Sequence, residues 1–199
     1  MAYKIITAAT TEPVTLDEAR NHLRIEPFGS PLAHPDDAKI AMLIRAAREW
    51  CEQYTGRAFA SQTIEMALDS FPTNEVQLPL TPVTSITYVK YYDVSGIEQT
   101  ISNTVYGLDD YSKPNWLILT NGSSWPETSG SANNVKVKMV VGDSPTTIPF
   151  AVKSAILLLV GSLYENRQED QLATSRASFN SMPTGVYNLL QPYRLELGV

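Results

Sequence analysis

The chain has 199 residues, a formal net charge of −6 and 43% hydrophobic residues, so it is long enough to bury a core without disulfide or metal staples. Its single cysteine, Cys51, excludes an internal disulfide and is typical of a protein made in a cytoplasm. The most apolar stretch, residues 155–160, is too short to span a bilayer, and we expect no membrane partner.

The negative charge is concentrated in the middle of the chain. Residues 60–149 contain nine acidic and four basic residues, and every arginine lies outside them. The sequence shows no basic patch with interleaved aromatic residues, which phosphate binding through counterion release would require. We therefore expect DNA to pass this protein without tight binding, because a like-charged surface repels phosphate.

Two helices are predicted near the N-terminus. Thr15 and Glu18 match a capping box that opens a short helix, and we expect this helix to stop at Pro27. After a loop rich in glycine and proline, a longer helix is predicted within residues 36–59. Asp36 or Asp37 can cap its start, and Gly56 supplies the residue that ends it.

The longer helix has one apolar stripe and one polar face. Positions three and four apart on the stripe are apolar, namely Ile40, Leu43, Ile44, Ala47, Cys51 and Tyr54. The charged residues lie mostly away from the stripe, namely Lys39, Arg45, Arg48, Glu49 and Glu52. This helix is predicted to be a packing element.

Residues 61–141 have the pattern of β-strands. Alternating or β-branched segments predict strands at residues 63–68, 83–92, 97–105, 116–119 and 135–141. The turn at residues 93–96 should join the second and third of these strands as a hairpin. We expect a small antiparallel sheet or barrel-like sandwich inserted between helices.

A third long helix is predicted to begin at Pro149. Its expected stripe contains Val152, Ala155, Ile156, Leu159 and Leu163, but further apolar residues surround it, namely Leu157, Leu158 and Val160. One partner cannot cover so much apolar surface. Either the sheet and the first helix enclose this helix, or a neighbouring copy of the chain does.

The C-terminal region combines a polar segment with an apolar end. Residues 168–185 lack clear periodicity over a length unusual for a loop inside a compact domain. Beyond them lie the candidate interface residues Val186, Tyr187, Leu189, Leu190, Pro192, Tyr193 and Arg194. This end either packs back on its own domain or docks on another subunit or protein.

We find no pattern that predicts catalysis, a cofactor or a metal site. His22 and His34 have no partners at metal-ligand spacing. The pairs Asp36/Asp37 and Asp109/Asp110 favour capping and a solvated turn, and Gly161 with Ser162 favours small-residue packing over a nucleophile. Trp116 and Trp125 could stack on a sugar ring, although aromatic residues in strands more often belong to a core.

Several short motifs along the chain together resemble those of one protein family. They are residues 12–19 (EPVTLDEA), 22–25 (HLRI), 46–50 (AAREW), 54–57 (YTGR), 78–83 (LPLTPV), 124–126 (SWP), 148–149 (IP), 164–167 (YENR) and 189–194 (LLQPYR). In this order they resemble the head-tail connector (head-completion, or adaptor) proteins of long-tailed bacteriophages. The resemblance covers nearly the whole chain.

This resemblance implies a structural virion protein without enzymatic activity or cofactor. Such a protein, assembled in the host cytoplasm, would form a ring of about twelve copies beneath the portal at the head-tail interface. It would extend the DNA channel and bind the portal protein and a neck or tail-completion protein. The seven C-terminal candidate residues would then contact the portal or a neighbouring subunit.

The predicted fold class is α+β, with a small core of about three helices, an inserted antiparallel β region and an extended C-terminal arm. The expected segments are the N-terminal core helices (1–59), the β-rich region (60–148), a core helix (149–167) and the assembly arm (168–199). Two other classes stay open. One is a carbohydrate- or ligand-binding β module built around Trp116 and Trp125, and the other is a small hydrolase using Cys51 or a serine beside His22 or His34.

Overall fold

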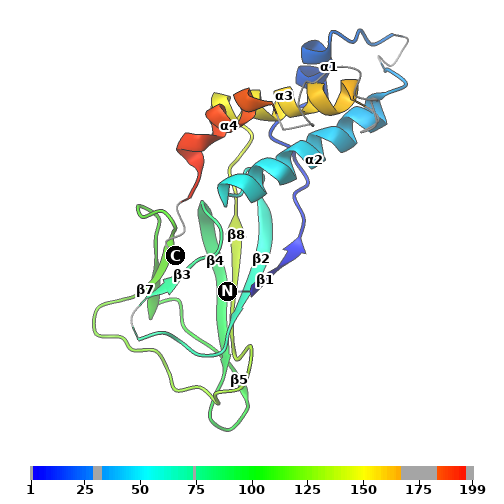
Figure 1. Cartoon of the computed structure of the whole chain (residues 1–199). Helices are drawn as coiled ribbons and strands as arrows, with labels where there is room; N and C mark the ends of the chain where they lie inside the picture. Colours follow the sequence, from blue (N-terminus) through cyan, green and yellow to red (C-terminus); the bar gives the residue numbers. More distant parts are fainter. Residues whose placement is uncertain (1, 29–32, 74, 167–182, 196–199) are drawn as a thin grey trace, which may run out of the picture. The chain divides into compact units, whose positions relative to one another are not determined.

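The computed structural model describes residues 2–28, 33–73, 75–166 and 183–195 (Figure 1). The chain divides into two compact units. Of the described residues, 2–11, 56–73, 75–143 and 195 form the β unit, and 12–28, 33–55, 144–166 and 183–194 form the helical unit. The predicted α+β class is confirmed. Residues 2–11, grouped with the N-terminal helices in the sequence-based division, belong to the β unit because Ala2–Thr7 form a strand of its sheet.

The β unit contains two antiparallel sheets. The larger sheet has the strand order β1-β2-β8-β4-β5, with β1 (Ala2–Thr7), β2 (Gln62–Leu68), β8 (Val135–Val141), β4 (Val83–Tyr92) and β5 (Glu98–Thr100). The smaller sheet has the order β3-β7-β6, with β3 (Val76–Gln77), β7 (Trp116–Leu119) and β6 (Tyr106–Asp109). The central strand of the larger sheet, β8, pairs with both β2 and β4.

Three of the predicted strands have the expected bounds. The bounds of β4, β7 and β8 are those expected, and the β4–β5 hairpin is confirmed although β5 is shorter than predicted. No local sequence pattern predicts β1, β3 or β6. Each of them is short or shows no apolar alternation in its sequence. They are strands because another segment of the chain completes their backbone hydrogen bonds.

The core of the β unit lies on one face of the larger sheet. In β8 the valines Val135, Val137 and Val141 are buried, whereas the intervening side chains lie on the opposite face. Leu117 of the smaller sheet belongs to the same hydrophobic cluster, so the two sheets share one core. The larger sheet therefore has an inner, buried face and an outer, polar face.

Gly142 ends β8 where no other residue fits. Its φ of +102° favours glycine, and a Cβ at this position would lie 2.1 Å from the carbonyl oxygen of Ala60. The chain leaves the sheet at this point and continues into the helical unit.

The helical unit contains α1 (Leu16–Leu23), α2 (Asp37–Thr55), α3 (Phe150–Glu165), α4 (Thr184–Leu190) and the 3₁₀ turn η1 (Gln191–Tyr193). The capping box of α1 is confirmed, with Thr15 and Glu18 bonding reciprocally. The prediction that this helix stops at Pro27 was wrong, because it already ends at Leu23, where Arg24 adopts the left-handed conformation. Gly56 follows α2 with φ +71°, as expected.

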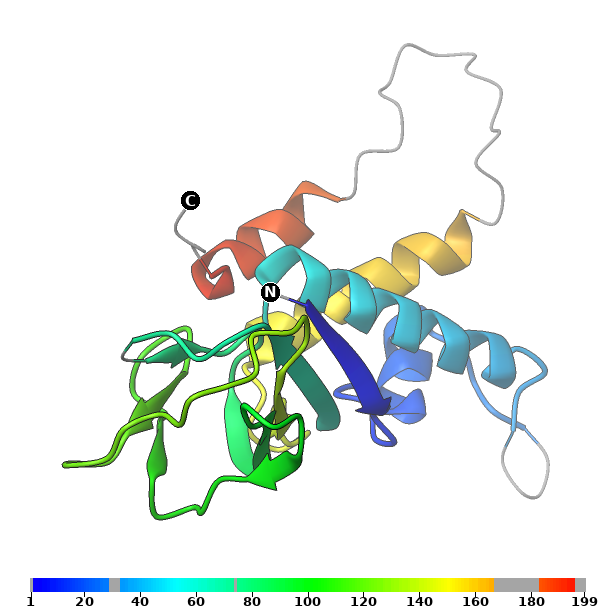
Figure 2. The same cartoon turned by 90° about the horizontal axis from the view of Figure 1, so that it is seen from below.

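Helix α3 packs on the other helices of its own unit. It packs against α1, α2 and α4, and α2 and α3 lie side by side in both views (Figures 1 and 2). Val152, Ala155, Ile156 and Leu159 are buried as predicted, but Leu163 is exposed. α4 covers part of the apolar surface for which the sequence left two alternatives open, the sheet with the first helix or a neighbouring copy. Among the described helices, none combines the length and apolarity needed to cross a membrane.

Candidate assembly surface

The seven C-terminal candidate residues fall into a buried and a surface group. Val186 and Leu190 are 0% exposed on α4, which packs on α3, so both contribute to the core of the helical unit. Pro192 and Arg194 are exposed, and the remaining members are half-buried, namely Tyr187, Leu189 and Tyr193. Most of the predicted arm, residues 168–182 and 196–199, lies outside the described residues.

An aromatic cluster fixes this segment to α2. Trp50 and Tyr54 stack with ring centroids 5.3 Å apart, and Tyr187 meets both rings edge-on at 5.6 and 5.2 Å. The hydroxyl of Tyr54 donates to Oε1 of Gln191 at 3.1 Å, and the Arg194 guanidinium lies 5.4 Å from the Tyr54 ring centroid. Two of the candidate residues, Tyr187 and Arg194, are therefore brought together on one aromatic base.

The helix pattern did not single out Trp50 as a surface residue and placed Tyr54 only on the buried stripe. Their four-residue spacing on one helix was the available signal, because residues i and i+4 are neighbours on a helix surface. Both rings are half-buried, so the cluster lies at the surface of the unit. It forms, with Gln191, Pro192 and Arg194, the surface that we name the C-terminal platform.

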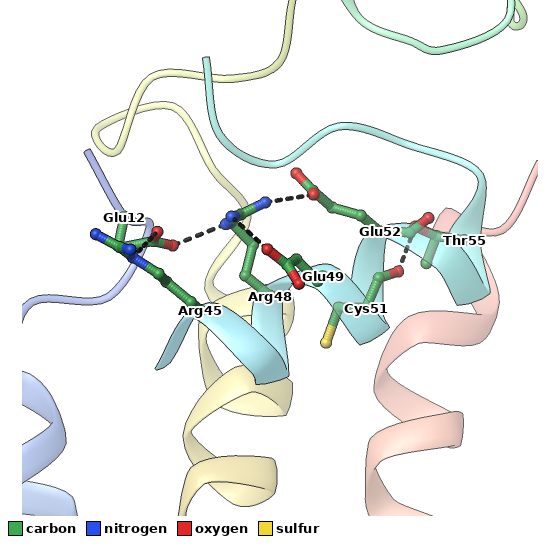
Figure 3. A network of polar contacts seen from close by, with 7 residues as sticks. All are labelled: Glu12, Arg45, Arg48, Glu49, Cys51, Glu52 and Thr55. Carbon is green, nitrogen blue, oxygen red and sulfur yellow. Dashed lines mark hydrogen bonds and ion pairs between the residues drawn. The ribbon is translucent and has the colours of Figure 1, made fainter. Parts of the chain in front are cut away.

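A buried arginine anchors the start of the helical unit to α2 (Figure 3). Arg48 is 7% exposed and donates from Nε to Glu12 at 2.8 Å and from Nη1 to Glu52 at 2.5 Å. Glu49 lies 3.5 Å from the same guanidinium, and Arg45 lies 3.7 Å from Glu12. The helix pattern groups Arg48 with the charged residues that lie mostly away from the apolar stripe, yet its guanidinium is buried because carboxylates from two segments surround it.

The electrostatics of this network hold Arg48 in its charged form. Burial opposes the charge, but the carboxylates of Glu52 and Glu12 outweigh it and raise the pKa of the guanidinium. The neighbouring Cys51 is buried, and burial raises the pKa of its thiol to about 12. Its expected role as a packing residue fits this environment, since a protonated thiol is a poor nucleophile.

The paired aspartates join three helices. Asp37 forms an ion pair with Arg20 of α1 and accepts a hydrogen bond from the His34 N–H at 2.8 Å. The Arg20 guanidinium lowers the pKa of Asp37. Asp36 accepts a hydrogen bond from the Tyr164 hydroxyl of α3. These carboxylates link α2 to α1 and α3, and the described residues contain no cluster of His, Cys, Asp or Glu suited to a metal ion.

The other residues singled out in the sequence have structural surroundings. Asp109 accepts a hydrogen bond from the Tyr111 N–H at 3.0 Å in an exposed turn. A Cβ on Gly161 would lie 3.3 Å from Nε2 of His22, so α1 and α3 approach closely there. Within the described residues, no hydrogen bond joins Asp110 or Ser162 to a histidine.

The aromatic residues of the rival carbohydrate site lie at the border of the β core. Trp125 stacks on Phe71 with centroids 4.7 Å apart, and both rings pack against the hydrophobic cluster. A depression of about 560 Å³ beside them is lined by these two rings, Leu119, Glu127 and several serines, threonines and prolines. Trp116 is half-buried in β7 and does not line this depression, so the two tryptophans do not form one platform.

Comparison with known proteins gives one family and one fold. Residues 27–195 match the family described as "Head completion protein". No curated protein matches the chain significantly.

Three solved structures share the fold over 100% of this chain and 98% of theirs. They are the neck of an empty GTA particle computed with C6 symmetry (TM-score 0.77, 24% identity), the virion of a native gene transfer agent (GTA) particle (0.76, 23%), and the neck of a native GTA particle computed with C12 symmetry (0.73, 24%). The match therefore includes elements of both compact units.

Proposed function

This chain belongs to the head completion protein family, and we propose that it forms a ring of about twelve copies beneath the portal of a tailed particle. Membership makes the chain a structural virion protein of the head-tail interface. The observation that carries the proposal is the family match, which spans residues 27–195. The carbohydrate-binding alternative is not favoured by this family.

The C-terminal platform is the proposed contact with the portal or a neighbouring subunit. Val186 and Leu190 hold α4 in the core, while Tyr187, Leu189, Pro192, Tyr193 and Arg194 complete the proposed contact set. Aromatic and arginine side chains on a rigid base are the residues that most often dominate binding energy in protein interfaces. The stacking of Trp50 and Tyr54 beneath this segment supports the proposal, because it limits the side-chain entropy lost on binding.

Ring formation requires two different surfaces on each copy. A head-to-tail contact joins one patch of a subunit to a different patch of the next. Phe150 of α3 is 86% exposed and Met42 of α2 is 61% exposed, and we assign these side chains to contacts between copies. The ring extends the DNA channel, contacts a neck or tail-completion protein and has no catalytic role.

Electron microscopy of the purified protein mixed with its portal tests this function. We expect added ring density on the portal, and a chain truncated after Leu190 should lose it. The truncated chain retains α4 and both buried anchors, so its helical circular-dichroism signal and cooperative melt should persist. Normal ring density with the truncated chain would contradict the role of the platform, and absence of a ring with the full chain would contradict the function itself.

A further inference from the structure

The outer face of the larger sheet carries a concentration of lysine and tyrosine. Its charged and aromatic side chains come from all five strands and are Lys4, Glu65, Tyr88, Lys90, Tyr92, Glu98, Lys136 and Lys138. The lysines outnumber the glutamates on this face, although the chain as a whole has a net charge of −6. The outer face therefore has a net positive charge, whereas the rest of the chain has a net negative charge.

This surface corrects the expectation that no basic patch with interleaved aromatic residues exists. Period-two alternation places Lys136 and Lys138 of β8 on the same side, and the pairing of β8 with β4 puts Tyr88, Lys90 and Tyr92 beside them. The two groups of residues are more than 40 positions apart in sequence. A search along the sequence does not reveal the patch, because only the pairing of the strands brings the groups together.

The ammonium groups lie over the tyrosine rings. Lys90 is 5.2 Å and Lys138 is 5.7 Å from the Tyr88 centroid, and Lys136 is 5.1 Å from the Tyr92 centroid. Glu98 forms an ion pair with Lys90 at 2.7 Å and lies 3.9 Å from Lys136. Within the described part of the chain, Lys138 forms no ion pair, although Glu65 is its neighbour across the β2–β8 pair, so its ammonium group can bind an external anion.

We infer that this lysine-tyrosine face is the surface of the chain that meets the phosphate backbone of duplex DNA. The inference rests on the proposed function, in which a ring surrounds the path of the genome. Charge complementarity favours a polyanion on this face and not on the remaining, acidic surface. Because lysines already cover the tyrosine rings, unpaired bases have no open aromatic platform, and a duplex backbone fits better than a single strand.

The same geometry predicts a weak and sequence-independent contact. Glu65 bonds the Tyr88 hydroxyl at 2.5 Å and pairs with Lys4 at 2.7 Å, so part of the positive charge is already neutralised. Simple charge contacts to phosphate carry no sequence information, and typical non-specific dissociation constants are about 10⁻⁴ to 10⁻⁶ M at physiological salt. Such a contact lets DNA slide past the surface.

The test is an NMR titration of the full chain with a short duplex of mixed sequence, repeated at several salt concentrations. We expect the shifted amides to cluster in β4 and β8. Lys136→Glu with Lys138→Glu should abolish these shifts, and Lys136→Gln with Lys138→Gln should lower the salt slope of binding by about 2. The control pair Arg24→Glu with Lys113→Glu makes the same change in net charge at exposed positions off this face and should retain the shifts.

Three other outcomes overturn the inference. Equal losses in the control pair would mean that only net charge matters, and shifts confined to other strands or helices would place DNA elsewhere. If the Lys136→Glu with Lys138→Glu variant still bound DNA but no longer formed a ring on the portal, this face would be a contact with an acidic protein surface. Absence of the ring in the unmodified chain, with the β4 and β8 shifts present, would instead contradict the proposed function and leave this inference standing.

Discussion

Arg48 shows how one buried charge can determine the stability of the helical unit. Arg48→Ala leaves the partly buried carboxylates of Glu12 and Glu52 without their cation. We expect a loss of about 3 kcal/mol in the free energy of unfolding, because an unpaired buried charge is costly. Urea melts at neutral pH provide the measurement. Arg45→Ala, at a 70% exposed position of the same network, should cost about 0–1 kcal/mol, and equal losses would refute the special role of Arg48.

The carboxylates around α1 make the helical unit sensitive to acid. The Thr15 N–H lowers the pKa of Glu18, and the Arg20 guanidinium lowers the pKa of Asp37. A carboxyl with a lowered folded-state pKa stabilises the protein above its unfolded pKa, near 4, and this contribution disappears as the pH falls through the folded-state value. We expect thermal melts to show a loss of stability below about pH 4. Asp37→Asn should reduce this pH dependence, and an unchanged acid profile in that variant would contradict the assignment.

At the scale of the elements, α3 is the centre of the helical unit. Leu159 is fully buried, so Leu159→Ala should cost about 2–5 kcal/mol as a cavity mutation. Leu43 lies on the predicted stripe of α2 but is only half-buried, and Leu43→Ala should cost less. Denaturant melts would compare these with Leu158→Ala, which removes a 38% exposed side chain. A loss at Leu159 no larger than that at Leu158 would exclude the proposed core.

The sequence predicts those elements whose pattern is local. Strands β4 and β8 alternate or carry β-branched residues throughout, and Thr15 with Glu18 specifies the start of α1, so each was identified correctly. Strand β1 is exposed along its whole length and exists only because β2 pairs with it, which a local pattern does not reveal.

The candidate surfaces are harder to predict because apolarity and charge do not identify a partner. The apolar C-terminus was equally compatible with packing on its own domain, and the structure buries Val186 and Leu190 there while exposing Pro192. In the helix pattern Arg48 falls among the charged residues away from the buried stripe. Its partner Glu12 is distant in sequence, and only the fold brings the two side chains together.

At the scale of the whole molecule, assembly should depend on exposed apolar side chains that the monomer does not need. Phe150→Glu changes an 86% exposed residue, so the free energy of unfolding of the free subunit should change by less than about 0.5 kcal/mol. The same variant should fail to form rings, because a charge would have to be buried in the contact between copies. Native mass spectrometry of portal mixtures measures this. Tyr111→Glu, at a 95% exposed turn, is the matched control and should assemble normally.

The position of β8 and α3 within their units has a consequence for synthesis on the ribosome. β8 lies between β2 and β4 in the sheet, and α3 packs on α1, α2 and α4, yet both central elements follow most of their neighbours in sequence. The strands and helices translated first must wait for residues 135–165 before either unit can close. An interrupted translation product therefore leaves both units open to proteolysis, and only chains translated past these elements persist to join a particle.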